Sequence, residues 1–210
     1  MPEEKDIYSL IAEGEHQRQD FKFEISSASK IARSLSAFAN TDGGRLLIGV
    51  KDNGKIAGVQ SDEEMFMVEA AGSLFCNPAV SCDMKSLRVE GKVVVIARIS
   101  PASELPVRAK LEDGRYCAFV RVADENIVAS PVQMELWRAD RNGRGTLISF
   151  GKDEQQLLRI LEKQEGITLS QFIRQAKLPR RRAIQLLADY IRFGLAQQVF
   201  VEHAFRYKTL

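Results

Sequence analysis

The stretch from 35 to 54, LSAFANTDGGRLLIGVKDNG, limits what this chain can fold into more than any other, because it places a helix end, a glycine pair and an apolar run side by side. Apolar residues spaced three and four apart over 28–39 predict an amphipathic helix, with Ser36 and Asn40 on its polar face. The glycine pair permits the positive φ that ends a helix. The apolar run that follows, 46–50, is typical of a buried strand.

The rest of the first 142 residues mixes helical and strand patterns. Asp52-Asn53-Gly54 is a hairpin sequence and predicts a second strand at 55–59. Further helices are predicted over 6–11, 62–75 and 132–137, and further strands over 15–23, 80–89, 92–99, 107–111 and 116–122. In the last strand Ala118, Val120 and Val122 alternate with Phe119 and Arg121, so we expect one face to be wetter than the other. This pattern predicts the α+β class.

Bulk composition excludes several classes of protein. The chain has 210 residues, of which 45% are hydrophobic and 28% charged, as in a soluble globular protein. It contains no apolar run of the roughly 20 residues that cross a membrane, and no signal-peptide layout at its start. Its three cysteines are odd in number and form no Cys-x-x-Cys pair. We therefore expect a cytoplasmic protein with reduced cysteines.

Charge is unevenly distributed and indicates two domains. Residues 151–210 hold eleven Lys or Arg against six Asp or Glu, whereas the remainder holds nineteen against twenty-two. A polar, glycine-containing stretch at 141–145 separates the two compositions. The sequence thus predicts one domain over 1–142 and a second over 150–210.

The second domain resembles a winged helix-turn-helix. Asp153 is expected to cap a first helix, and a second follows over 169–176. Pro179 opens a third helix, which ends at Gly194. Two short strands, around 199–208, form a closing hairpin. Helix-turn-helix proteins insert the later helix of the pair into the major groove of DNA, and the resemblance implies that the hairpin contacts the backbone.

Basic residues of this domain are the predicted contacts to nucleic acid. Three successive arginines at a helix N-terminus oppose the helix dipole, so an anionic partner is favoured. The predicted contact residues are Lys177, Arg180, Arg181, Arg182, Gln185, Arg192, Arg206 and Lys208. His203 and Tyr207 in the hairpin are expected to assist. The alternative is a protein-interaction or dimerisation domain whose arginines form a solvated face.

The first domain resembles the Schlafen AlbA-type domain over about residues 10–140. The resemblance is carried by the acidic segment 15–22, by Ala-Phe-Ala-Asn-Thr-x-Gly-Gly at 37–44, by Ile-Gly-Val at 48–50, and by Gly-x-x-Cys-Ala-Phe-Val-Arg-Val at 114–122. It implies a mixed α/β fold associated with nucleic-acid binding. Some animal members cleave structured RNA with three carboxylates and a divalent metal, and bacterial members are often described as ATP-binding or as DNA-binding regulators.

Carried over to this chain, the resemblance implies that the three carboxylates are Glu15, Asp20 and Asp52. Together they would hold Mg²⁺ or Mn²⁺ and activate a water for attack on a phosphodiester. His16 and Gln19 depart from the family pattern, which has a serine and an apolar residue there, and Asp20 is shorter than the family's glutamate. The alternative interpretations are that Glu15 is a solvated acid, that Asp20 pairs with a base, and that Asp52 forms the hairpin turn.

The glycine pair does not favour an ATP site. A phosphate-binding loop precedes a helix, so that backbone amides at the helix N-terminus face the anion. Here Gly43 and Gly44 follow a helix, and Asp42 adds negative charge. A helix cap with a tight turn is the simpler interpretation.

Taken together, the sequence predicts a nucleic-acid-binding protein, most simply a DNA-binding transcriptional regulator. Its partner would be DNA or structured RNA, and a helix rich in Phe and Met at 65–75 would support a homodimer. A divalent-metal-dependent endoribonuclease is the first alternative, and an ATP-binding or protein-interaction module is the second.

Overall fold

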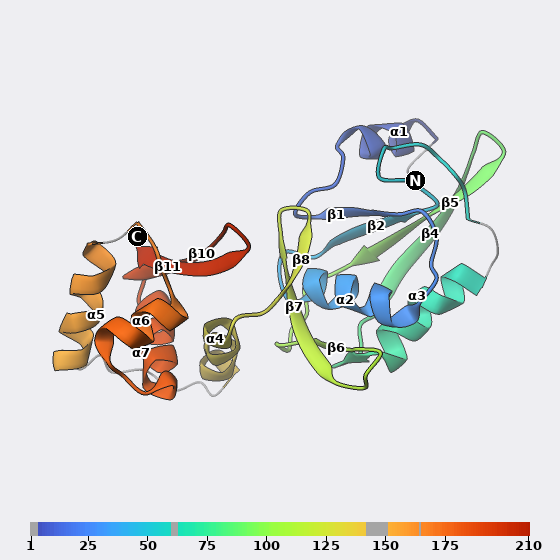
Figure 1. The fold of residues 1–210 in the computed structure, drawn as a ribbon. Helices are drawn as coiled ribbons and strands as arrows, with labels where there is room; N and C mark the ends of the chain where they lie inside the picture. Colours follow the sequence, from blue (N-terminus) through green and yellow to red (C-terminus); the bar gives the residue numbers. More distant parts are fainter. Residues whose placement is uncertain (1–3, 60–62, 142–150, 164) are drawn as a thin grey trace. The chain divides into compact units, whose positions relative to one another are not determined.

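The computed structural model describes residues 4–59, 63–141, 151–163 and 165–210. The chain forms two compact units, residues 1–129 and 130–210 (Figure 1). Helix α4 (Pro131–Arg141) belongs to the second unit, so the division falls before the predicted linker, most of which lies outside the described residues. The two units are described separately below.

The first unit contains a four-stranded sheet in the order β1-β2-β5-β4. Its strands are β1 (Gln19–Lys22), β2 (Gly44–Ile48), β4 (Cys82–Val89) and β5 (Lys92–Ile99). Strand β1 runs parallel to β2, and the other pairs are antiparallel. The apolar run of the motif is therefore an inner strand, as its composition predicts.

Both faces of the apolar part of β2 are buried. Leu46 and Ile48 pack into a core beneath helix α2 (Ala28–Ala39), whereas Leu47 packs on the opposite face with Ile7 of helix α1 (Glu4–Ala12). Successive side chains of a strand point to opposite faces, so a strand covered on both sides must be apolar at every position.

A second four-stranded sheet, in the order β3-β6-β7-β8, covers the other side of α2 (Figure 1). Its strands are β3 (Cys76–Asn77), β6 (Arg108–Lys110), β7 (Tyr116–Val122) and β8 (Glu125–Val128). Helix α3 (Glu63–Leu74) packs beside α2. Because α2 lies between two sheets, it has few positions that reach water.

This placement corrects the prediction of a polar, outward face on α2. Ser36 and Asn40 are buried and bind the second sheet. Asn40 Nδ2 donates to the carbonyl oxygens of Val107 and Phe119, at 2.8 Å each, and Asn40 Oδ1 accepts from Val107 N at 2.7 Å. Ser36 Oγ donates to Val107 O and accepts from Phe119 N. The polar residues of the motif thus satisfy backbone groups that would otherwise be buried without partners.

The C-cap of α2 is Asn40, and the glycine pair completes the tight turn that follows it and makes a close backbone approach. Gly43 has a φ of +68°, and its N–H donates to Phe38 O. A Cβ at Gly44 would lie 2.5 Å from the Phe38 ring and 2.9 Å from the Arg18 carbonyl oxygen. The interpretation as a helix cap with a tight turn is confirmed, since the pair follows α2 and leads directly into β2.

Two other predictions for the first unit need correction. Residues 55–59 form no strand, only a single bridge between Val50 and Ile56. The wetter face expected on β7 does not exist, because Phe119 is 6% and Arg121 2% exposed. Strands β3 and β8 were not predicted, since two and four residues give too little pattern.

In the described part of the second unit, four helices accompany a three-stranded antiparallel sheet in the order β10-β11-β9. After α4 come α5 (Lys152–Glu162), β9 (Ile167–Thr168), α6 (Leu169–Ala176), α7 (Arg180–Arg192), β10 (Ala196–Val201) and β11 (Ala204–Thr209). The cap of α5 is Gly151 and not Asp153, which lies in the first turn. Helix α6 begins with a capping box between Thr168 and Gln171.

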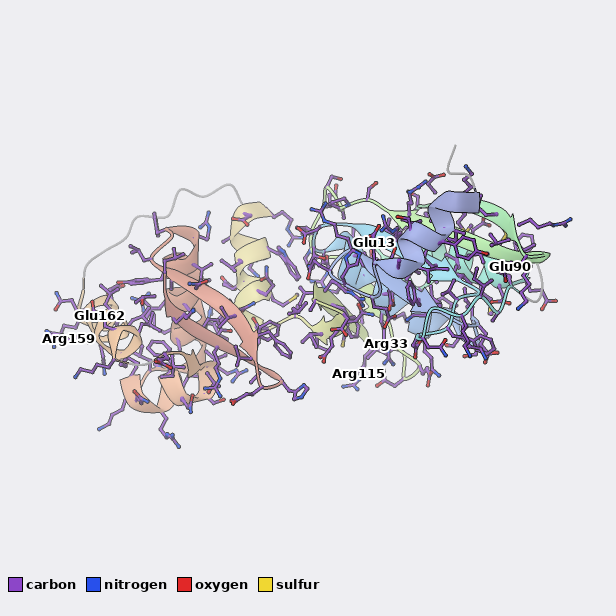
Figure 2. All side chains as sticks on the ribbon, turned by 90° about the horizontal axis from the view of Figure 1, so that it is seen from above. Glu13, Arg33, Glu90, Arg115, Arg159 and Glu162 are labelled. Atoms are coloured by element: carbon purple, nitrogen blue, oxygen red, sulfur yellow. The ribbon has the colours of Figure 1, made fainter. Side chains whose placement is uncertain are left out.

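Charged side chains such as Glu13, Glu90, Arg115, Arg159 and Glu162 project from the surface (Figure 2). No helix in the described part of the chain is both long and apolar enough to cross a membrane.

Candidate nucleic-acid interface

The N-terminus of α7 is presented by a three-residue turn after α6. Lys177 adopts the left-handed conformation that ends α6, and Pro179 is the extended cap of α7. Buried residues of α7, among them Leu186, Leu187 and Tyr190, fix the helix against the core. Because this face is buried, the first turn of the helix exposes its arginines.

The three successive arginines of that turn have different surroundings. Arg182 pairs with Asp153 at 3.3 Å and with Glu154 at 2.7 Å, both on α5. Arg180 and Arg181 are exposed, and neither has an acidic partner among the described residues. Arg182 thus joins two helices, whereas its neighbours are available to an external anion.

Two further predicted contacts are also paired. Arg192 lies 3.2 Å from Asp140, and Arg206 lies 2.7 Å from Glu202. The Nε of Arg206 is buried without a hydrogen-bond partner. These pairs reduce the positive charge that the two residues offer to a phosphate.

The remaining predicted contacts are Lys177, Arg180, Arg181, Gln185 and Lys208. Within the described ranges, none of the four cations among them has an acidic partner. Gln185 follows Arg181 by four residues, so the two side chains share one face of α7. This face combines charge for phosphates with an amide that can hydrogen-bond base edges.

The β10–β11 hairpin has a tight turn at Glu202 and His203, with φ of +52° and +58°. His203 is exposed at this turn. Tyr207 is 1% exposed, and its hydroxyl lies 3.4 Å from Ser130 Oγ. Burial raises the pKa of Tyr207. The prediction that Tyr207 assists binding is therefore wrong, because the side chain belongs to the core.

In the first unit, the structure brings Glu15 and Asp20 together. Burial, followed by the interaction with Asp20, raises the pKa of Glu15. Burial also opposes ionisation of Asp20, but the hydrogen bond with Glu15 and the charges of Lys22 and Arg121 outweigh it and lower its pKa. As the pH falls, Glu15 is therefore protonated before Asp20.

Asp20 is surrounded by partners from three elements. Its carboxylate lies 2.7 Å from Lys22 Nζ, 3.5 Å from Arg121 Nη2 and 3.4 Å from Ser34 Oγ. The interpretation that Asp20 pairs with a base is confirmed. A carboxylate so neutralised has little charge left for a cation.

Asp52 does not join the pair. Asp20 is level with Leu46 in the parallel register of β1 and β2, and Asp52 lies six residues further on, in the exposed turn beyond Val50. In the described part of the chain, which includes all three carboxylates, no group of three His, Cys, Asp or Glu could hold a metal ion. The donors therefore do not fit the Mg²⁺ or Mn²⁺ site that the resemblance implies.

Comparison with known proteins identifies the first unit. The family model described as Schlafen, AlbA_2 matches residues 15–130, more than half of the chain. The chain belongs to this family. The match ends at Ser130, where the second unit begins.

Two solved structures are similar to the chain. One is the DIP2311 protein from Corynebacterium diphtheriae, with 21% identity, a TM-score of 0.46, and coverage of 70% of this chain and 34% of that chain. The chain thus spans about a third of that protein's length. The other is the N-terminal domain of a protein from Nitrosomonas europaea described as related to the ATP-dependent DNA helicase RecG, with 20% identity, a TM-score of 0.40, and coverage of 62% and 91%. No curated protein matches the chain significantly.

Two residues of the AlbA_2 domain have structural roles that sequence reasoning missed. Gln19 is fully buried and donates to the carbonyl oxygens of Leu10 and Gly14, which ties β1 to the end of α1. Arg121 is buried and donates to the backbone oxygens of His16 and Gln19. The departure at Gln19 from the family pattern was the signal that could have identified the first role.

Proposed function

We propose that this protein is a DNA-binding transcriptional regulator that contacts DNA through its C-terminal unit. The observation that carries the proposal is the pair of exposed arginines, Arg180 and Arg181, in the first turn of α7 without acidic partners in the described chain. The N-terminal end of a helix carries partial positive charge, so exposed cations there are unfavourable. A bound phosphate offsets this repulsion. Membership of the AlbA_2 family points to nucleic-acid binding as well.

The architecture of residues 152–209 supports a winged-helix assignment. Helix α6 and helix α7 are joined by three residues, as in a helix-turn-helix, and the β10–β11 hairpin follows them. In such proteins the second helix of the pair enters the major groove. Gln185 would then face base edges. Arg181, Lys177 and Lys208 would contact phosphates.

The predicted homodimer belongs to this proposal, because a two-fold dimer would match a palindromic site. Sedimentation of the full chain, alone and with DNA, measures this directly. A monomer in both conditions would remove the dimer from the proposal but leave the contacts of α7 in place.

Fluorescence anisotropy of the full chain with labelled duplex DNA and a labelled RNA hairpin tests the proposal. Over a salt series we expect duplex binding whose log affinity falls linearly with log salt concentration. Binding to neither nucleic acid at low salt would contradict the proposal. Binding to the RNA alone would contradict the choice of DNA.

A further inference from the structure

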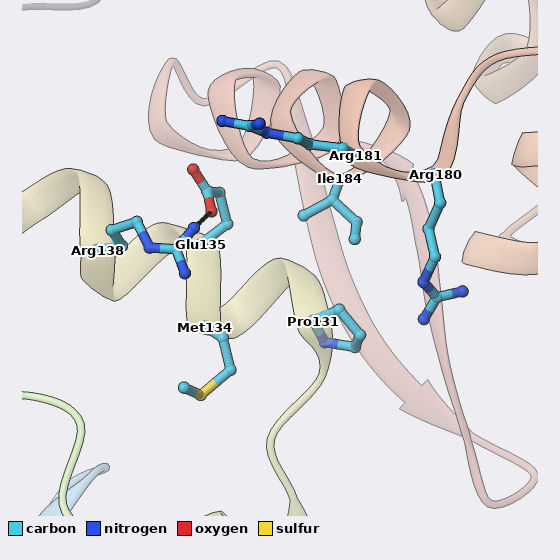
Figure 3. A pocket seen from close by; sticks show the side chains of 7 residues that line it. All are labelled: Pro131, Met134, Glu135, Arg138, Arg180, Arg181 and Ile184. Atoms are coloured by element: carbon cyan, nitrogen blue, oxygen red, sulfur yellow. Dashed lines mark hydrogen bonds and ion pairs between the residues drawn. The ribbon is translucent and has the colours of Figure 1, made fainter.

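A pocket lies within the second unit between α4 and the N-terminal half of α7 (Figure 3). Its volume is ≈ 490 Å³, which falls in the range of about 300 to 1,000 Å³ typical of small-molecule sites. It is lined by Pro131, Met134, Glu135, Arg138, Arg180, Arg181 and Ile184. Nothing in the proposed contact with DNA uses the α4 side of this pocket.

The walls of the pocket are held in place by the core. Val132 and Leu136 of α4 are buried in the same cluster as Leu187 of α7. Met134 and Ile184 are partly exposed, and both line the pocket. The unbranched Met134 side chain adapts to the shape of an apolar ligand.

The charge of the lining is positive. Glu135 and Arg138 lie 2.7 Å apart and neutralise one another. Arg180 and Arg181 keep their full charge, since neither has an acidic partner in the described part of the chain. Three arginines against one glutamate give the lining a formal charge of +2.

We infer that this pocket binds a small organic anion with an apolar body, and that the bound anion weakens DNA binding by engaging Arg180 and Arg181. A free phosphate would satisfy the arginines but leave Met134 and Ile184 exposed to water. A neutral apolar molecule would cover these side chains but leave the guanidinium groups without a counterion. Only a ligand with both parts matches the lining. The effect on DNA rests on the proposed function, whereas the binding of the anion does not.

Anilinonaphthalene sulfonate is a suitable probe, and N-phenylnaphthylamine is its neutral counterpart without the sulfonate. Met134 is the only methionine in residues 130–210, so its methyl resonance reports on this pocket in the full chain. Labelled Met134 is assigned by the loss of its signal in Met134→Leu. We expect the sulfonate to shift the Met134 resonance saturably and to bind at least about tenfold more tightly than the neutral counterpart, the ratio that one charged hydrogen bond contributes.

Variants separate the two parts of the site. Arg180→Ala combined with Arg181→Ala should weaken the sulfonate about tenfold or more and leave the neutral probe nearly unchanged. Met134→Gln should weaken both probes and leave DNA binding unchanged. Arg159→Ala, an exposed arginine on α5, is the matched control and should change neither.

An unshifted Met134 resonance at saturating sulfonate, or equal sulfonate affinity in wild type and both pocket variants, would overturn the assignment of the site. If the sulfonate fills the pocket without weakening DNA binding, the inference that the bound anion regulates DNA binding is overturned. Absence of DNA binding by the unliganded protein contradicts the proposed function alone, because the Met134 shift still supports the anion site.

Discussion

Arg182 Nη2 lies 2.7 Å from Glu154 Oε1, whereas the adjacent Arg181 extends along the exposed side of α7 (Figure 3). Two neighbouring arginines in one helical turn therefore have different surroundings. Arg182 joins α7 to α5, and Arg181 faces outward. This difference allows stability and ligand binding to be tested with single substitutions of the same type.

Replacing Arg182 by alanine should lower the free energy of unfolding by about 1 to 2 kcal/mol. The substitution leaves the buried Glu154 carboxylate without this partner, and the figure is kept small because Arg182 is 39% exposed. Urea unfolding of the full chain measures the change. Arg181→Ala is the control and should remain within about 0.5 kcal/mol of wild type. Equal effects of the two substitutions would contradict the division of roles.

Replacing Asn40 by alanine should destabilise the chain by about 2 to 4 kcal/mol, because three hydrogen bonds to the backbone of Val107 and Phe119 are lost in the core. Asn40→Asp keeps the acceptor for Val107 N but loses both donors, and should be at least as damaging. Denaturant unfolding checks both variants. A stable Asn40→Asp protein would show that the donors contribute little.

The carboxyl pair predicts a specific pH dependence of stability. The pKa of Asp20 is lowered in the folded protein, so its contribution is present above the unfolded value of about 3.9 and is lost as pH falls through the folded value. Asp20→Asn should therefore cost about 2 kcal/mol near neutral pH, and the difference from wild type should shrink in acid. Unfolding free energies measured across the acid range test this.

Glu15 provides the opposite sign in the same experiment. Its raised pKa means that its contribution is present below the unfolded value of about 4.3 and is lost as pH rises through the folded value. The pH slope of stability should thus differ most between Glu15→Gln and wild type in the range between the unfolded and the folded pKa of Glu15. Parallel curves for wild type and both variants would contradict the opposite pKa shifts of Glu15 and Asp20.

The sequence predicted the bounds of helices and strands better than it predicted which of their side chains are buried. Strands β5 and β7 and helix α6 match their predicted bounds, because long apolar runs and clear turn residues specify them locally. The burial of Ser36 and Asn40 was not predictable, since helical periodicity assumes one covered face and α2 has two. The second sheet, whose strands lie within residues 76–128, covers the other side of α2.

The candidate site shows the same limit. The arginine run of α7 was evident from the sequence. That Arg182 is paired while its neighbours are exposed depends on Asp153 and Glu154, which lie nearly thirty residues earlier in the chain. Likewise, Arg121 reaches Asp20 only because β7 and β1 come together in space. Such pairings depend on tertiary structure and leave no local pattern.

The salt dependence of DNA binding tests the central claim most directly. The slope of log affinity against log salt concentration should be measured for wild type, Arg181→Ala and Arg182→Ala, under conditions in which all three are folded. Each lost phosphate contact reduces the magnitude of the slope by about 0.9. We predict this reduction for Arg181→Ala and an unchanged slope for Arg182→Ala. An unchanged slope for Arg181→Ala, or a larger reduction for Arg182→Ala, would contradict the account.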